Sequence, residues 1–188
     1  TFENIVGGSG NDVLTGNSLG NSFTGNAGND TLSGGSGNDT YIFGPASAAE
    51  ADIVSEGTNQ GSDTLSFVSL TTGVTLNLTK SIVQAVHTNR TLKLNSGSTF
   101  ENIVGGSGND VLTGNLLNNT FTGNAGNDTL FGFNGNDTLT GGAGNDTLFG
   151  GLGNDTYVFG TASAAEADIV SEGTNQGSDT LSFVSLTS

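Results

Sequence analysis

The chain has 188 residues, of which 32 are glycine and only 32% are hydrophobic, and it contains no Trp, Met or Cys. Eighteen carboxylates against three basic residues give a formal net charge of -15 at pH 7, which argues against a nucleic-acid partner because phosphate binding needs clustered Lys and Arg. This composition also excludes one large central core, disulfides and thiolate metal sites, and its short apolar runs predict no membrane insertion.

The first predicted element is a block of four nine-residue repeats, within residues 1–42. Three of the four follow the pattern glycine, any, any, glycine, Asn-Asp, any, bulky apolar, any, as in GGSGNDVLT from Gly7, and the repeat at Gly16 departs from it at the fourth to sixth positions. The bulky eighth residue lies mostly between Thr, Ser or Val, which is the alternation of a half-buried strand. The glycines favour tight turns with positive φ. Each repeat is therefore predicted to be one turn followed by one three-residue strand, with these inward side chains: Leu14, Phe23, Leu32 and Tyr41.

The second predicted element, residues 43–104, lacks the repeat but keeps strand-like pieces at 52–54, 63–67, 74–78 and 91–94. We expect the coil to continue here through irregular strands that cap the first block. A short hairpin around His87 to Arg90 is expected to protrude. The three basic residues, Lys80, Arg90 and Lys93, form either a patch that docks on an acidic neighbouring chain or an ordinary exposed loop.

A second block of six repeats occupies residues 105–158, and residues 159–188 begin a second capping segment that copies 43–72. The eighth positions of these six repeats are occupied by Leu112, Phe121, Leu130, Leu139, Leu148 and Tyr157. Residues 1–17 recur unchanged 98 residues later, whereas the segment from Gly34 recurs almost unchanged 116 residues later, so the second block carries an 18-residue insertion. We expect the chain to be a piece of a longer tandem array.

The aspartates carry the strongest chemical signal. Eight of the twelve occupy the sixth position of a repeat. Aspartates that served only to solvate the surface would not need to recur at one position of the repeat. Carboxylate and carbonyl oxygens are the ligands that hard cations such as Ca²⁺ prefer. The predicted metal ligands are Asp12, Asp30, Asp39, Asp110, Asp128, Asp137, Asp146 and Asp155.

In these repeats the chain resembles the RTX (repeats-in-toxin) family of nonapeptide modules. The resemblance implies an all-β fold, a right-handed parallel β-roll with two short sheets and several Ca²⁺ ions in the turns. Two repeats make one coil of such a roll, so the 18-residue insertion lengthens it without exchanging its faces. The resemblance also implies backbone carbonyl ligands, for which we name Gly8, Gly10, Asn26, Gly28, Gly106, Gly108, Asn124, Gly126, Gly142 and Gly144.

Some candidate ligands are weaker. The repeats at Gly16 and Gly114 carry Asn21 and Asn119 in place of Asp, so each is either a low-affinity site or, as we favour, a structural turn without metal. In the capping segments, terminal ligands and plain solvent exposure remain alternatives for the following carboxylates: Asp52, Glu56, Asp63, Asp168, Glu172 and Asp179.

The function that follows is a calcium-binding extracellular or cell-surface module that folds on Ca²⁺ and forms a stiff rod in a surface, matrix, filament or adhesin protein. An alternative is the secretion and folding module of an RTX enzyme or toxin, whose type I secretion the resemblance implies. Ice binding fits less well, because the third position of the repeats lacks threonine. The chain has neither H-E-x-x-H nor G-x-S-x-G, and His87 has no obvious partner, so we expect no catalysis. Self-association into fibres is the expected partner interaction, for which Phe131, Phe133 and Phe149 offer an apolar contact.

Overall fold

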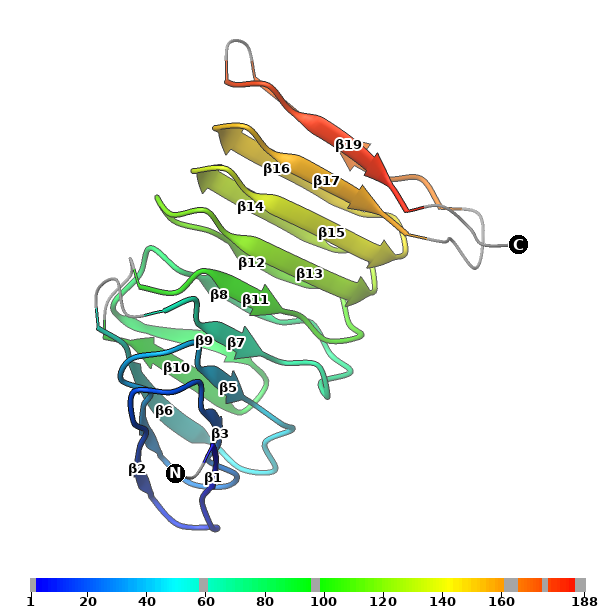
Figure 1. Ribbon diagram of the computed structural model, residues 1–188. Helices are drawn as coiled ribbons and strands as arrows, with labels where there is room; N and C mark the ends of the chain where they lie inside the picture. The colour runs from blue at the N-terminus through cyan, green and yellow to red at the C-terminus, as the bar shows by residue number, and fades with distance from the viewer. Residues whose placement is uncertain (1–2, 58–60, 96–98, 161–165, 174–175, 185–188) are drawn as a thin grey trace.

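The computed structural model describes residues 3–57, 61–95, 99–160, 166–173 and 176–184, and the parts of the predicted segments 43–104 and 159–188 that fall in the gaps lie outside this description. The described chain winds as a stack of short strands joined by turns (Figure 1). None of its described residues forms a helix, so no membrane-spanning helix is found there.

One face of the stack is a single nine-stranded parallel sheet. Neighbouring strands in the repeat blocks are 18 residues apart, for example Ser22 beside Thr40 and Thr120 beside Thr138, which is two repeats per coil. In order along the rod its strands are β1 (Asn4–Val6), β3 (Ser22–Thr24), β5 (Thr40–Ile42), β7 (Thr64–Ser66), β11 (Asn102–Val104), β13 (Thr120–Ala125), β15 (Thr138–Ala143), β17 (Thr156–Phe159) and β19 (Thr180–Phe183).

The opposite face is divided into two five-stranded sheets. The first runs β2 (Val13–Thr15), β4 (Thr31–Ser33), β6 (Glu50–Ser55), β10 (Arg90–Leu94) and β9 (Val83–His87). The second runs β8 (Thr75–Asn77), β12 (Val111–Thr113), β14 (Thr129–Asn134), β16 (Thr147–Leu152) and β18 (Ile169–Val170). Successive repeats therefore alternate between the two faces, and the predicted all-β parallel roll is confirmed.

The core is a thin line of side chains between the faces. The eighth-position residues fill it, from Phe23 and Leu32 to Leu148 and Tyr157, each at most 1% exposed, while Leu14 in the first coil is only partly buried. Phe23 stacks on Tyr41 with ring centroids 5.1 Å apart. Each inward side chain thus packs on the side chains of neighbouring coils, which is why a strand of three residues is stable only in the stack.

The capping segment 43–104 keeps this core although it lacks the repeat. Val54 pairs with Leu32 across 22 residues and Leu65 pairs with Tyr41 across 24, and both are fully buried. The parallel register is kept although these coils are four to six residues longer than the repeat coils. The strands of this segment therefore continue the parallel pairing of the repeat block.

The predicted protruding hairpin is wrong in one respect. β9 and β10 do form an antiparallel hairpin around His87 and Arg90, but β10 also pairs in parallel with β6 and so becomes part of the sheet. Both interpretations of the basic residues placed Arg90 at the surface, and its side chain is instead only 4% exposed. The reason is charge: it enters the protein to pair with two carboxylates, described below.

Candidate metal centre

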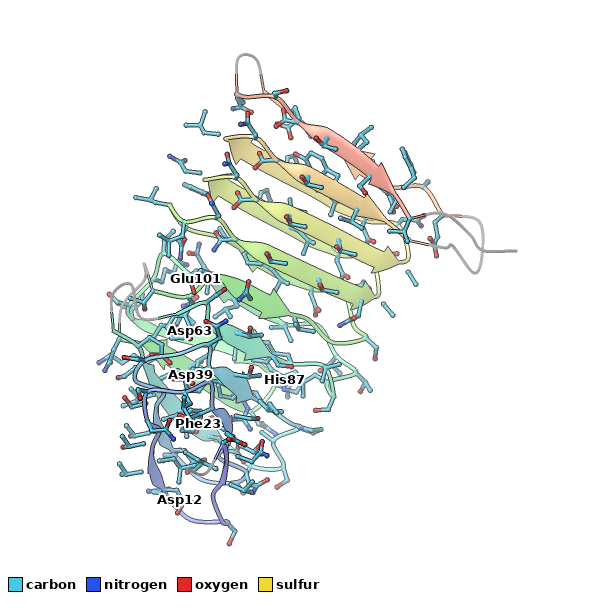
Figure 2. All side chains as sticks on the ribbon, viewed as in Figure 1. Asp12, Phe23, Asp39, Asp63, His87 and Glu101 are labelled. Carbon is cyan, nitrogen blue, oxygen red and sulfur yellow. The ribbon has the colours of Figure 1, made fainter. Side chains whose placement is uncertain are left out.

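Carboxylates and asparagines stack into two columns, one at each turn edge of the roll. In the first column the amide N–H of Asp12 donates to Oδ1 of Asp30 over 2.9 Å, and the same contact joins Asp110 to Asp128 over 2.7 Å. Figure 2 shows part of the second column, with Asp39, Asp63 and Glu101 following one another along the rod. The first column has two parts, one on each five-stranded sheet: Asp12, Asp30 and Asp52 form the first, and Asp110, Asp128, Asp146 and Asp168 form the second, where the N–H of Val74 donates to Asp110. The second column contains Asn21, Asp39, Asp63, Glu101, Asn119, Asp137, Asp155 and Asp179.

Each column aspartate except Asp12 accepts an N–H of an earlier coil with Oδ1, and in six of the twelve the second oxygen is buried without a hydrogen-bond partner. Such an anionic oxygen, cut off from water and from any donor, is strongly unfavourable unless a cation neutralises it. Hard oxygen ligands in a turn edge are the donor set that Ca²⁺ takes, so the residues fit this metal. The inaccessible, unpartnered oxygens are Oδ2 of Asp30, Asp39, Asp128, Asp137, Asp146 and Asp155.

Turn conformation explains which oxygens are left bare. In the first coil of each block, the N–H of Gly8 donates to Oδ2 of Asp12 over 2.6 Å, and that of Gly106 donates to Oδ2 of Asp110 over 2.8 Å. In the later turns the second position has positive φ, as at Asn26 with φ 68° and Asn124 with φ 79°. In those later turns the Oδ2 oxygens accept no hydrogen bond and remain bare.

The predicted carbonyl ligands fall into two groups by conformation. Asn26, Gly28, Asn124, Gly126, Gly142 and Gly144 all have positive φ, whereas Gly8, Gly10, Gly106 and Gly108 do not. Successive turns stack closely: a side chain at Gly126 would meet the carbonyl oxygen of Gly108 at 2.6 Å. Ligation by these carbonyls stays a prediction.

Burial raises the pKa of several buried column carboxyls, Asp128, Asp137 and Asp63 among them. Desolvation, with smaller contributions from neighbouring carboxylates, raises the pKa of Asp128 and Asp137 to about 7 and that of Asp63 to about 6. In the capping segments, burial together with the neighbouring aspartates raises the pKa of Glu56 and of Glu172 to about 7. Near neutral pH these groups therefore gain from a partner that is positively charged, either a proton or a metal ion.

The two asparagine turns differ from the aspartate turns in one useful way. Oδ1 of Asn21 accepts from the N–H of Asn17, and Oδ1 of Asn119 accepts from that of Asn115, at 2.8 and 2.9 Å. Nδ2 of Asn119 also donates to the carbonyl of Glu101 over 3.1 Å. A neutral amide thus satisfies these positions with protein groups alone, which supports the interpretation of structural turns without metal.

Among the capping carboxylates, Asp52, Asp63, Asp168 and Asp179 all take the sixth-position role, since each accepts the N–H of an aspartate one coil earlier. Asp52 differs because its second oxygen is bound by Arg90 Nη1. Nη2 of Arg90 also donates to Oε2 of Glu50 over 2.6 Å. The guanidinium is a built-in cation at a column position, and sequence reasoning missed it because Arg90 and Asp52 are 38 residues apart.

Sequence reasoning also missed the fifth-position asparagines and Glu101. Oδ1 of Asn11 accepts the N–H of Asn29 over 2.8 Å, and the same contact joins later coils at both edges. The regular recurrence of Asn before Asp within this chain was a signal that could have found this ladder. No pattern marked Glu101, whose Oε2 accepts the N–H of Asp63 across 38 residues.

Comparison with known families agrees with this geometry. The family model of the RTX calcium-binding nonapeptide repeat (4 copies) matches residues 2–18, 15–45, 96–130, 113–143 and 131–161, which together exceed half of the chain. A search of curated proteins found no significant match. The chain therefore belongs to the family of proteins with RTX calcium-binding nonapeptide repeats.

Proposed function

We propose that this RTX repeat chain is a non-catalytic structural module of a secreted or cell-surface protein, and that it folds on binding Ca²⁺ into a stiff rod. The observation that carries the proposal is the set of six buried aspartate oxygens without a donor. A metal-free rod must hold these charges one coil apart and out of water. Calcium between the coils removes both costs at once.

The folding step follows from the balance of forces. All twelve aspartates of this chain, whose net charge is -15, stand in the two columns. The core is one line of side chains, so little apolar burial offsets the charge repulsion and the chain entropy. Metal binding to the folded chain alone then appears as folding free energy. Extracellular calcium sites typically bind at about 10⁻⁴–10⁻³ M, so the chain would stay unfolded at cytosolic calcium and fold after export.

A stiff rod suits a stalk, matrix or filament, and one surface feature supports self-association. Phe131 and Phe149 stack on the outer face of β14 and β16 with centroids 4.8 Å apart, beside Phe133, which is 52% exposed. The half-buried pair Phe131 and Phe149 together with the exposed Phe133 offers an apolar contact for a second copy. Analytical ultracentrifugation in calcium tests this part: Phe131→Ser/Phe149→Ser should reduce association, and unchanged association contradicts it.

Far-UV circular dichroism in chelator, followed by titration with Ca²⁺ and in parallel with Mg²⁺, tests the central proposal. We expect a cooperative transition from coil to β structure in calcium alone, because Mg²⁺ demands a tighter octahedral geometry and dehydrates reluctantly. Full β structure in chelator, unchanged by calcium, contradicts coupled folding.

A further inference from the structure

We propose that Asp39, Glu56 and Asp63 form a divalent-cation site that closes the first repeat block, and that Asp155, Glu172 and Asp179 form its copy after the second block. The glutamate comes from the capping segment and not from a nonapeptide, so this site has a side-chain ligand that the turns between repeats lack. The inference rests on the proposed function, since it assigns one further class of site to the same calcium-binding chain.

The ligand geometry fits one ion. Oxygen ligands of Ca²⁺ lie at about 2.3–2.6 Å, so two oxygens on one ion are at most about 5 Å apart. One carboxylate oxygen from each of Asp39, Glu56 and Asp63 lies within 4.8 Å of the others. The same holds for Asp155, Glu172 and Asp179, 116 residues later.

Unpartnered atoms point independently to a ligand. Asp39 is fully buried, and its Oδ2 has no hydrogen-bond partner. Oε2 of Glu56 is likewise inaccessible and unpartnered. Three carboxylates converge here, of which Asp63 is also buried, and no basic side chain contacts them in the described part of the chain. Only a cation from solution, or protons, can neutralise this group.

Gly34 and Tyr41 shape the site from the protein side. A side chain at Gly34 would collide with Oδ2 of Asp39 and Oε1 of Glu56, so glycine keeps the space in front of both carboxylates open. The buried hydroxyl of Tyr41 donates to Oε1 of Glu56 and so positions it, leaving Oε2 free for an ion. Tyr157 stands at the same position of the copy, where the N–H of Gly150 donates to its hydroxyl over 2.7 Å.

The charge of this site predicts its rank among the calcium sites. A turn pair inside a block brings two carboxylates together, for instance Asp128 and Asp146, whereas the closing site brings three. More charged ligands raise the affinity for calcium. The closing sites should therefore fill first as calcium rises and empty last as it falls, which would fix the end of each block.

The chain supplies its own probe, because Tyr41 and Tyr157 are its two tyrosines and it has no tryptophan. Tb³⁺ replaces Ca²⁺ in oxygen sites, and its emission is sensitised by a nearby tyrosine. In a Tyr157→Phe background, tyrosine-excited Tb³⁺ emission reports on the site at Tyr41 alone. Glu56→Gln in this background should weaken Tb³⁺ binding by about tenfold or more, because it removes a charged ligand.

Glu172→Gln in the same background is the matched control, since it makes the same change at the copy and should leave the Tyr41 emission intact. Calcium-dependent circular dichroism of each variant separates the two proposals. If both variants fold normally with calcium and their emission titrations are equal, the closing site is overturned and the proposed function stands. If the parent chain shows no calcium response at all, the proposed function is overturned. If Glu56→Gln does not fold, anomalous diffraction from Tb³⁺-soaked crystals of the unmutated chain decides: an ion bound by Glu56 supports the site, and an ion that Glu56 does not touch overturns it.

Discussion

The sequence Glu-Ala-Asp-Ile-Val-Ser occurs twice and folds differently each time. At residues 50–55 it forms all six residues of β6, with Glu50 and Asp52 6% and 3% exposed. At residues 166–171 only Ile169 and Val170 form a strand, β18, and Asp168 is exposed. β6 lies between β4 and β10, whereas β18 has a strand neighbour on one side in the described chain. A solenoid strand therefore depends on a neighbour at each side, and β10 is the neighbour that brings a cation with it.

Removing that cation gives the largest expected effect and tests the comparison directly. Arg90→Gln leaves Asp52 and Glu50 buried without a partner, which costs about 3–5 kcal/mol for a broken buried pair and should make β6 resemble β18. Urea denaturation in saturating calcium measures the change. The control Lys93→Gln, on the same strand but outside the ion pairs of the described residues, should change stability by less than about 0.5 kcal/mol. Equal effects of the two substitutions would falsify the role of Arg90 as an internal cation.

The second prediction contrasts the interior of the first column with its exposed end. Asp128→Asn keeps the shape of the side chain and the hydrogen bond that Oδ1 accepts from the N–H of Asp110. It removes the negative charge of the carboxylate, whose Oδ2 has no hydrogen-bond partner. We expect the calcium midpoint to rise by about tenfold, or about 1.4 kcal/mol, and one bound ion to be lost by calorimetry. Asp168→Asn at the exposed end should have a smaller effect. A larger effect at Asp168 than at Asp128 contradicts the assignment of the metal to the buried interior.

The third prediction concerns protons as substitutes for calcium. Protonation should stabilise the fold less than calcium does, because a proton neutralises one carboxylate but does not bridge ligands from two coils. The folded pKa of Asp128 and Asp137 is about 7, raised by burial above the ordinary value. The folded chain then binds more protons than the unfolded chain between about pH 4 and 7, so its stability falls as pH rises through this window.

Circular dichroism in chelator should accordingly show more β structure at the acidic end of the window than above it. In saturating calcium the trend should reverse, because protons compete with the metal for the same oxygens. The same direction of change with and without calcium would argue that the column carboxylates are not the metal ligands.

The smallest expected effect concerns one turn. Phe133 has φ 88° at the second position of its repeat, where the neighbouring turn on the same edge has Gly151 with φ 107°. Phe133→Gly should raise the free energy of unfolding by about 0.5–1 kcal/mol, because positive φ strains a bulky residue. Thermal melts in calcium measure this. Leu152→Ala, which trims an exposed apolar neighbour without strain relief, should not stabilise, and an equal gain in both variants would attribute the effect to lost apolar surface.

Much of the fold could be predicted because the repeat is local and periodic. The nine-residue period placed Leu112, Leu130 and Leu148 on one buried line and Asp110, Asp128 and Asp146 on one column, and the structure has both. The parallel β-roll followed from the resemblance to RTX proteins, which the family match confirms. The ligand assignments themselves stay predictions.

The capping segments mark the limit of that reasoning. Glu101 joins the second column across 38 residues, and Arg90 reaches Asp52 across the same separation, with no period to indicate either contact. The sequence also could not predict which aspartate oxygens lack a hydrogen-bond partner, because this depends on the sign of φ at one turn residue, such as Asn26.

By itself the sequence determined the coil, the line of buried side chains and the two carboxylate columns. In a solenoid each repeat contacts only its neighbours, so a constant repeat length identifies which residues lie side by side. Only the tertiary structure decided what completes the end of the first block: a guanidinium at Asp52 and a third carboxylate beside Asp39. The physical reason is that a non-repeating segment has no internal register. Its contacts depend instead on the carboxylates and the unpaired strand edges that the repeat block presents to it.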